Sequence, residues 1–405
     1  MMIIEKNSGK VKNKVISMNY KTPCYVIHEK ELDDNFIKLT NALQKHWNNY
    51  IIGYSYKTNA LPWIIKHFND LGCYAETVSE DEYNLAKLIG VSKDKIVYNG
   101  PIKTKDTFIE AVNNNCIVNI DSEREIEWLD EVDIPMRSVG IRVNFNIEKM
   151  CKGQSQCPED GGRFGFCYEN GELGKTIDIL LSKKVRISGL HLHTSSKSRG
   201  LDIYRAIAEV ACRIQKEYSL ELDYVDVGGG FFGGLPTKPQ FDEYISLMES
   251  ILIKCFNKQK TKLIVEPGMA VIGAPVSYIT TVIDVKDTEF NRFVITDGTR
   301  TSIDPLMTKK AYFHRLKING ERYVHPKQVV CGYTCMEHDR LFEELEGPTL
   351  QMGDQIIYDK VGAYTMSLTP LFIKYFPDVY VENNGKYDLV RKAWKPEQYV
   401  QLSKY

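Results

Sequence analysis

The repeating unit of this chain is visible in residues 187–230, which read ISGLHLHTSSKSRGLDIYRAIAEVACRIQKEYSLELDYVDVGGG. A short apolar run at 187–192 is followed by a helical pattern at 202–217 and by a second apolar run at 224–227. Parallel neighbouring strands need a long crossover, which is usually a helix. The stretch therefore predicts a βαβ unit with two parallel strands.

The same alternation extends over most of residues 30–270. Apolar runs predict eight strands, at 51–56, 72–75, 96–98, 117–120, 139–145, 187–192, 224–227 and 263–265. Helical patterns lie between them at 62–70, 80–89, 104–113, 123–130, 172–182, 202–217 and 240–256, and another at 31–46 precedes the first strand. Eight parallel strands alternating with helices predict an α/β fold, a closed (β/α)₈ barrel.

The chain beyond the barrel follows a different pattern. Strand-like segments at 276–285, 293–297, 327–331 and 355–359 are separated by turn residues, which predicts a largely β domain. We expect an N-terminal segment, 1–30, that joins this β domain through residues 25–27. The barrel is expected over 31–272, and a C-terminal β-sandwich or β-barrel domain over 273–405.

Composition limits the partners of the protein. The 405 residues include 52 Lys+Arg against 53 Asp+Glu, a formal net charge of −1, so no long-range attraction to nucleic acid or anionic membranes is expected. No apolar run approaches the roughly 20 residues that span a bilayer. The near-zero net charge also favours a small-molecule ligand held by a local site. Ten scattered cysteines and a polar, lysine-rich start predict a reduced, cytoplasmic protein. Cys151, Cys157 and Cys167 lack the paired spacing of a zinc site, so no metal is expected.

The ends of the predicted strands carry the chemistry of such a barrel. Lys57 follows the first strand, where its amine could form an imine. Three glycines at 228–230 follow the seventh strand and could bring backbone N–H groups close to a phosphate. Hydroxyl groups at 194–196 follow the neighbouring strand. Together with a histidine and a carboxylate, these groups favour a phosphorylated aldehyde cofactor.

Six short motifs resemble, in the same order, those of the fold-type III pyridoxal-phosphate decarboxylases, the group of diaminopimelate and ornithine decarboxylases. They are YSYKTN at 54–59, HLHTSS at 191–196, DVGGG at 226–230, EPG at 266–268, GYTC at 332–335 and GAY at 362–364. The resemblance implies an alanine racemase-like barrel with a C-terminal β domain. It also implies pyridoxal 5′-phosphate as cofactor and a homodimer whose active sites are shared between subunits.

The resemblance assigns roles to the matching residues. Lys57 would be the Schiff-base lysine, and His193 would stack on the cofactor ring. Glu266 would pair with the pyridine nitrogen and keep it protonated, and Cys335 of the partner subunit would deliver a proton to Cα. The other implied cofactor-binding residues are Glu76 near the lysine, Arg142 near the cofactor, and Ser196, Gly228, Gly229, Gly230 and Tyr364 at the phosphate.

Three positions depart from the pattern of the diaminopimelate enzymes. Met269 stands where that group has an arginine that reaches the phosphate and a substrate carboxylate, and Asp304 stands where it has a second arginine. A distal carboxylate needs charge-assisted donors, so both changes argue against diaminopimelate. Met336 follows Cys335, where the group usually has an acidic residue. The predicted substrate-binding residues are Asp304, Met336 and Glu337. Their acidic groups could bind a cationic substrate group, or the site could admit a conjugated or carrier-linked substrate.

The sequence therefore predicts a pyridoxal-phosphate-dependent decarboxylase of an amino acid or an amino-acid-derived intermediate. One alternative is an amino-acid racemase of the same fold, but racemases of this type usually place an arginine against the pyridine nitrogen, so Glu266 favours decarboxylation. A second alternative is a non-catalytic pyridoxal-phosphate-binding protein, a group that generally lacks the β domain.

Overall fold

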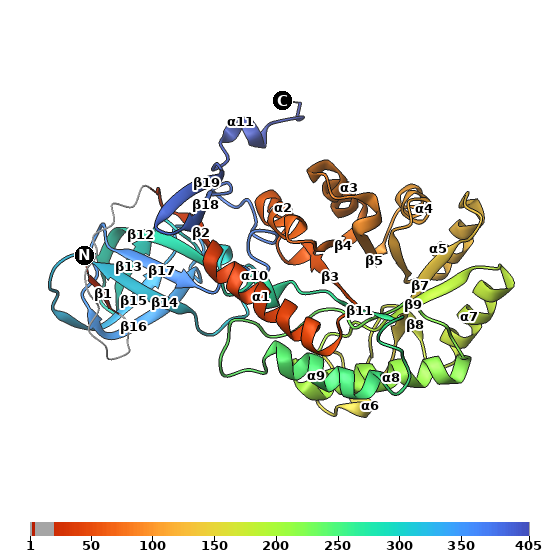
Figure 1. Ribbon diagram of the computed structural model, residues 1–405. Coiled ribbons are helices and arrows are strands. Elements are labelled where there is room, and N and C mark those ends of the chain that lie inside the picture. The colour runs from red at the N-terminus through yellow and green to blue at the C-terminus, as the bar shows by residue number, and fades with distance from the viewer. Residues whose placement is uncertain (1, 5–19, 405) are drawn as a thin grey trace. The chain divides into compact units, whose positions relative to one another are not determined.

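A computed structural model describes residues 2–4 and 20–404, with side chains from residue 20 onward (Figure 1). The chain divides into two compact units. One is Asn35–Val271, and the other combines the described residues of Met1–Asp34 with those of Ile272–Tyr405. Within the described residues, no helix is both long and apolar enough to cross a membrane.

The first unit is a closed barrel of parallel strands. Going around the barrel, the order is β6-β5-β4-β3-β11-β10-β9-β7, and pairing of β6 with β7 closes the ring. The predicted (β/α)₈ fold is therefore confirmed. The strands are β3 (Tyr50–Ser55), β4 (Tyr74–Ser79), β5 (Ile96–Ile102), β6 (Ile117–Ile120), β7 (Ser138–Asn144), β9 (Arg186–His191), β10 (Tyr224–Asp226) and β11 (Lys262–Val265), with the short β8 (Phe166–Cys167) beside the end of β7.

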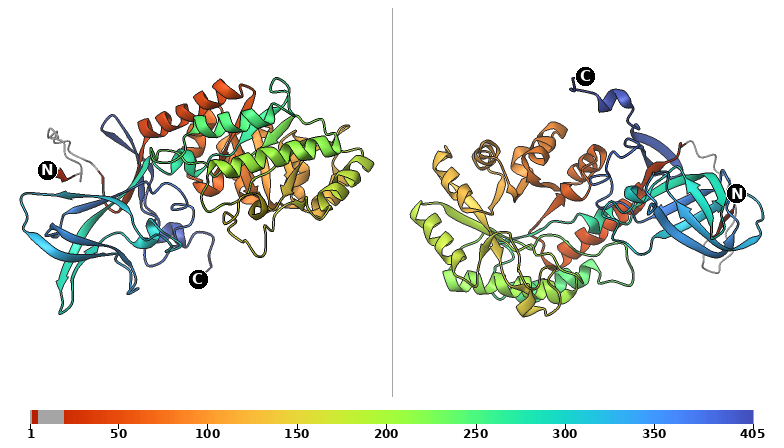
Figure 2. Two further views of the ribbon diagram at one scale, coloured as in Figure 1. Left: turned by 90° about the horizontal axis from the view of Figure 1, so that it is seen from below. Right: turned by 180° about the vertical axis from the view of Figure 1, so that it is seen from behind.

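Helices cover the outside of the ring (Figure 2). In α8, for example, the buried residues Ile203, Ile207, Val210 and Ile214 recur every three or four positions, which forms one apolar stripe that packs inward. The helices of this unit are α2 (Pro62–Asp70), α3 (Glu80–Ile89), α4 (Lys105–Asn113), α5 (Glu123–Trp128), α6 (Ile147–Met150), α7 (Glu172–Ser182), α8 (Leu201–Tyr218) and α9 (Phe241–Leu252), while α1 (Glu29–His46) and α10 (Met269–Ile272) cross its boundaries.

Tyr224 fills part of the barrel interior. The residue is buried, and a Cβ atom added to Gly189 would lie 2.2 Å from its ring. A Cβ atom on Gly140 would lie 2.1 Å from the tyrosine hydroxyl oxygen. Real Cβ atoms do not approach other atoms so closely, so the barrel accommodates this tyrosine only because both facing positions are glycine.

Strand β4 is longer than the sequence predicts. The expected strand ends at residue 75, but β4 continues to Ser79, so Glu76 lies inside the strand and is buried. Its register pairs Glu76 with Ser55 of β3. Alternating residues of a strand point to opposite faces, and polar residues in AETVS concealed this continuation.

The second unit is built on a ten-stranded sheet, which confirms the predicted β domain after the barrel. Its main path is β1-β14-β17-β12-β13-β15-β16, and β2 pairs antiparallel with β12 and parallel with β18. The strands are β1 (Met2–Ile4), β2 (Cys24–His28), β12 (Val276–Asp287), β13 (Arg292–Thr296), β14 (Phe313–Ile318), β15 (Val324–Cys331), β16 (Arg340–Pro348), β17 (Gln355–Asp359), β18 (Asp378–Asn383) and β19 (Lys386–Arg391); the helix α11 (Pro396–Tyr399) follows them.

Candidate active site

Lys57 lies at the C-terminal end of the barrel, in a single turn of 3₁₀ helix, Tyr56–Thr58, directly after β3. Its Nζ donates to Glu76 Oε2 over 2.6 Å, and Ser55 Oγ donates to the same oxygen over 2.6 Å. Glu76 is 1% exposed, whereas the lysine side chain is 37% exposed. The buried carboxylate therefore fixes the direction of a lysine that solvent and small molecules can still reach.

A buried asparagine joins this carboxylate to a second one. Asn99 Nδ2 donates to Glu76 Oε1 over 3.1 Å and to Glu266 Oε1 over 2.5 Å. Asn119 Nδ2 donates to Asn99 Oδ1 over 2.8 Å, and the Tyr224 hydroxyl donates to Asn119 Oδ1 over 2.7 Å. Because one amide oxygen accepts at each step, every amide has only one suitable orientation, and the chain presents N–H donors to both carboxylates. Sequence analysis missed this chain.

Glu266 follows β11 and lies next to His191 and Asp226. His191 Nε2 is 3.4 Å from Glu266 Oε2. Burial favours a higher pKa for Glu266, but the nearby His191 and Lys57 outweigh that effect and lower its pKa. For Asp226, burial and the Glu266 carboxylate raise the pKa well above its usual value. Asp226 thus holds the proton of this pair, and Glu266 carries the charge.

His193 faces the glycine loop. Its Nδ1 accepts from the Gly229 N–H over 3.3 Å, which leaves the proton of the neutral ring on Nε2. Burial and, secondly, the positive charge of Lys57 lower the pKa of His193 to about 3, so the ring is neutral at physiological pH. A neutral flat ring fixed by a backbone N–H is suited to stacking against an aromatic ligand.

The glycine loop has no room for side chains. Gly228 has φ of +69°, and a Cβ atom there would lie 2.4 Å from the Cβ of His193. A Cβ atom at Gly229 would lie 2.1 Å from the carbonyl oxygen of Glu266. Gly230 also has positive φ, +90°. The N–H groups of Gly228 and Gly229 donate to Asp226 Oδ1 and His193 Nδ1, so the part of the loop that is open to an anion is the exposed backbone at Gly230.

Arg142 is held from the side by Asp121, a residue that sequence analysis did not single out. Arg142 Nη1 donates to Asp121 Oδ2 over 2.9 Å, and the Gly165 N–H donates to the other oxygen over 3.2 Å. The guanidinium also lies 4.5 Å from the ring centroid of Phe164. Asp121 therefore ties β7 to the turn at 164–165.

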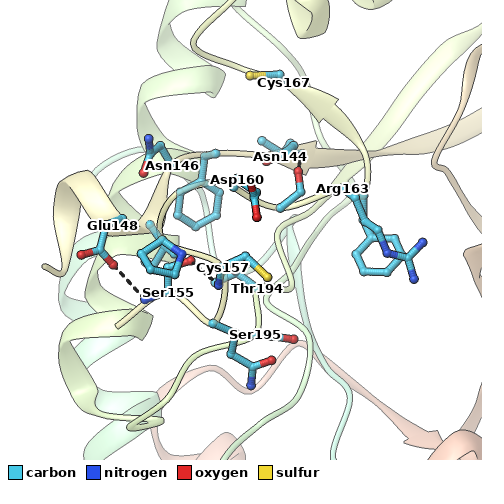
Figure 3. Close-up of a pocket in the computed structure, with 18 of the residues that line it drawn as sticks. Asn144, Asn146, Glu148, Ser155, Cys157, Asp160, Arg163, Cys167, Thr194 and Ser195 are labelled. Atoms are coloured by element: carbon cyan, nitrogen blue, oxygen red, sulfur yellow. Dashed lines mark hydrogen bonds between the residues drawn. The ribbon is translucent and has the colours of Figure 1, made fainter. Parts of the chain in front are cut away.

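A cavity of about 450 Å³ opens beside His193. Arg142 and Asn144 line it from β7, and the loop at 155–164 lines the opposite side. The loop is shaped by Glu148, whose carboxylate accepts from the Ser155 N–H over 3.1 Å (Figure 3). The lining side chains that carry charge or can bind ions include Arg142, Glu148, Glu159, Asp160, Arg163 and Glu169.

Five predicted site residues belong to the second unit, and their roles stay predictions. Cys335 is an exposed free thiol, and Glu337 has a side chain 98% exposed. Asp304 is buried, and both of its oxygens accept hydrogen bonds within the segment 300–312. Met336 is half-buried, and Tyr364 has a left-handed φ of +56°.

The turn that carries Cys335 is also fixed by a residue that sequence analysis missed. Asp339 Oδ2 accepts from Thr334 Oγ1 over 2.6 Å, and Asp339 Oδ1 accepts from the Arg300 N–H over 2.8 Å. A Cβ atom on Gly332 would lie 2.2 Å from this carboxylate. The cysteine is therefore presented by a rigid turn, although its own side chain is exposed.

The groups in the barrel fit pyridoxal phosphate, the cofactor that the resemblance implies. Lys57 provides an amine for the aldehyde, and the glycine loop provides a cradle for the phosphate. Glu266 is an ionised carboxylate that could accept from a protonated ring nitrogen. His191 Nδ1 is buried without a hydrogen bond in the described residues, so the site keeps a polar atom that protein groups leave unused.

Comparisons with known proteins agree with this geometry. Residues 33–273 match the family described as "Pyridoxal-dependent decarboxylase, pyridoxal binding domain". The diaminopimelate decarboxylase of Methanocaldococcus jannaschii is 28% identical, with 87% of this chain and 84% of the relative covered. That of Aquifex aeolicus is 26% identical over 96% of this chain and 93% of the relative. A crystal structure of the M. jannaschii enzyme in co-complex with L-lysine has a TM-score of 0.82 at 25% identity, and covers 94% of this chain and 91% of that chain.

These relatives correct one prediction. The sequence argued against diaminopimelate because arginines are missing at Met269 and Asp304, and that argument is wrong, since relatives named for diaminopimelate match nearly the whole chain. In the structure, a guanidinium group lies beside each position. Arg199 Nη1 is 2.6 Å from Met269 Sδ, and Arg300 Nη2 is 3.2 Å from Asp304 Oδ2.

Proposed function

We propose, because this chain belongs to the family of pyridoxal-dependent decarboxylases, that it removes one carboxyl group from diaminopimelate and leaves lysine. The chain is a pyridoxal 5′-phosphate-dependent carboxy-lyase acting on an amino acid. The observation that carries the choice of substrate is the near-complete match to proteins named diaminopimelate decarboxylase, over 96% of this chain for the Aquifex aeolicus relative.

The charges of the cavity beside His193 support this substrate. Diaminopimelate has an ammonium and a carboxylate at each end, so its distal end needs an anionic and a cationic partner when it leaves water. Arg163 and Asp160 line the same cavity (Figure 3). A site for lysine or ornithine would need only the anionic partner.

The residues at the strand ends have separate tasks in this proposal. The bound cofactor supplies an electron sink for the charge left when CO₂ departs. Lys57 provides the amine that holds the cofactor aldehyde, and Glu76 orients that amine. Glu266 would accept from the ring nitrogen and keep it protonated, while the neutral His193 would cover the ring. The glycine loop and Ser196 hold the phosphate.

The proposal includes a homodimer. The family resemblance assigns Cα protonation to Cys335 of the partner subunit, and the exposed thiol on its rigid turn is available for such a role. A thiol can deliver a proton to carbon as a general acid. The dimer is tested by subunit mixing, as described in the Discussion.

Measurement of CO₂ release tests the reaction and the substrate together. Purified protein loaded with pyridoxal phosphate is offered diaminopimelate, lysine, ornithine and arginine, each labelled at the carboxyl carbon. We expect release from diaminopimelate with lysine as the product, and none of it in a Lys57→Ala variant. Inversion at Cα is followed in the same samples by chiral chromatography.

The outcomes separate the parts of the proposal. Release from ornithine or arginine, with none from diaminopimelate, would overturn the proposed substrate and leave the decarboxylase intact. Undiminished release by Lys57→Ala would overturn the role of the lysine. A folded Lys57→Ala protein is verified by its thermal unfolding midpoint, so loss of activity is not mistaken for loss of structure.

A further inference from the structure

Arg199 is a cation without a strong anionic partner. Its Nη1 donates to the thioether sulfur of Met269, which is a weak acceptor, and its guanidinium lies 5.5 Å from the ring centroid of Phe232. No carboxylate in residues 20–404 forms an ion pair with it. The side chain is half-buried, so it has given up part of its hydration. An arginine in this state retains donors for an incoming anion.

The backbone of Arg199 is fixed by the same aromatic cluster that supports the glycine loop. The Tyr244 hydroxyl donates to the Arg199 carbonyl over 2.7 Å, and the Tyr204 hydroxyl donates to the Gly229 carbonyl over 2.9 Å. The two tyrosine rings pack on each other with centroids 4.8 Å apart, and Phe231 stacks on Tyr204 at 4.6 Å. The arginine and the glycine loop are therefore parts of one rigid assembly.

The local conformation also connects Arg199 to the expected phosphate ligands. Its φ is +54°, a left-handed value that is unfavourable for a residue with a side chain. Its N–H donates to Ser196 Oγ over 3.2 Å. Among the described residues the Ser196 hydroxyl donates to no protein acceptor, so its hydrogen can point at an anion. The glycines and Ser196 supply no formal positive charge, whereas a phosphate carries between one and two negative charges.

We propose that Arg199 binds the phosphate of pyridoxal phosphate and supplies the positive charge that Met269 cannot. The inference rests on the proposed cofactor site and does not depend on which amino acid is decarboxylated. In the structure the guanidinium contacts the sulfur of Met269, so it must leave this weak acceptor to bind a phosphate. Arginine is suited to this task because its planar group binds two phosphate oxygens at once.

Lys238 provides a matched control. Its Nζ lies 5.3 Å from the same Phe232 ring, so it is a second cation on the same aromatic side chain. It is exposed, and no contact joins it to Met269 or Ser196 among the described residues. If positive charge in this region favours phosphate binding only in a general way, removal of either cation should weaken pyridoxal phosphate binding equally.

The test compares two ligands that differ only in the phosphate. Dissociation constants of pyridoxal phosphate and of pyridoxal are measured by absorbance on the apo forms of the wild type, Arg199→Met, Lys238→Met and the double variant Arg199→Met/Met269→Arg. We expect Arg199→Met to weaken pyridoxal phosphate binding by about tenfold or more, as for loss of a hydrogen bond to a charged group, and to change pyridoxal binding by less than about twofold. Lys238→Met should match the wild type, and the double variant should recover most of the lost affinity.

Other results overturn the inference. Equal weakening for both ligands would make Arg199 a structural residue, and unchanged binding would exclude it from the phosphate site. An equal loss of pyridoxal phosphate affinity in Lys238→Met would show that nearby positive charge in general, and not a specific contact with Arg199, favours binding. Arg199→Lys, which keeps the charge, should bind with intermediate affinity and serves if Arg199→Met does not fold. A wild type that binds the cofactor but does not release CO₂ from diaminopimelate refutes the proposed substrate alone.

Discussion

At the scale of single residues, Asn99 connects the two buried carboxylates of the site. One amide group donates to two buried carboxylates, and its own oxygen is held by Asn119. Glu76 faces the lysine, and Glu266 is the carboxylate assigned to the ring nitrogen. Asn99 is therefore a positioning residue that acts through its two acidic neighbours.

Asn99→Leu should lower kcat by about tenfold or more, because a hydrogen bond to a buried charged group contributes about 1.5–3 kcal/mol. Loss of the donor also raises the pKa of Glu266, so the acid limb of the kcat profile should move to higher pH. Tyr224→Phe, which removes only the far end of the chain, should have a smaller effect on both. A pH profile of Asn99→Leu that coincides with that of the wild type would refute this role.

The lowered pKa of His193 predicts how the stability of the folded protein depends on pH. Its pKa is lowered to about 3 in the folded protein, so below its unfolded value of about 6.5 the unfolded chain binds a proton that the folded chain does not. Stability should therefore fall as pH decreases from about 6.5 toward 3. In His193→Phe, the unfolding midpoint of the apoprotein should depend less on pH over the part of this range where unfolding is reversible. Thr194→Val, in the same segment, should keep the wild-type slope, and equal slopes in all three proteins would contradict the prediction.

The predictable part of the site consists of residues whose chemistry is unusual at a strand end. A charged side chain or a run of glycines is uncommon at the end of a buried strand and therefore indicates a function. This applies to Lys57, Glu266 and the glycines at 228–230. Asn99 and Arg199 do not stand out, since an asparagine in a strand and an arginine in a loop are common. Their contacts join segments far apart in the chain, and no local pattern predicts those.

At the scale of elements, regular alternation predicted the barrel, and charged edge strands hid part of the β unit. The strands of the barrel are buried and apolar, so each one is visible in the sequence. In contrast, β16 reads RLFEELEGP and β19 reads KYDLVR, with most side chains at least partly exposed. Polar residues interrupt the period of two, and such strands are recognised only after their partners are known.

The tie between Asp121, Arg142 and the turn at 164–165 should contribute strongly to stability. Arg142 and Asp121 are 11% and 4% exposed, and Asp121→Asn would leave a buried cation without its partner. We expect a loss of about 3–5 kcal/mol in the free energy of unfolding, measured by denaturant titration. The exposed pair of Arg186 and Asp223 is a matched control, and Asp223→Asn should cost about 1 kcal/mol or less. Similar losses in both variants would refute the difference.

At the scale of the whole molecule, we propose that the β unit contributes to the chemistry through Cys335. Cys335 belongs to that unit, and Lys57 belongs to the barrel. Cys335→Ala should slow turnover or cause misplaced protonation at Cα while the cofactor stays bound. Loss of the cofactor in this variant would mean that the cysteine has a different role.

Mixing Lys57→Ala with Cys335→Ala, each of which is impaired alone, tests whether subunits share sites. If Cys335 of the partner subunit completes each site, a heterodimer of Lys57→Ala and Cys335→Ala has one site with both changes and one site with neither. Random mixing should therefore restore about a quarter of wild-type activity in a twofold-symmetric dimer. Mixtures that stay inactive after verified subunit exchange would show that each chain uses its own cysteine.

The two glycines that face Tyr224 also have a consequence for protein engineering. Gly140 and Gly189 determine how deep the tyrosine ring sits, and the ring determines which way Asn119 and then Asn99 donate. Two positions with no side chain thus influence how N–H donors are presented to carboxylates that they never touch. A mutant library aimed at new substrates should leave both unchanged, because a single added methyl group would alter catalysis while every residue around the ligand stays intact.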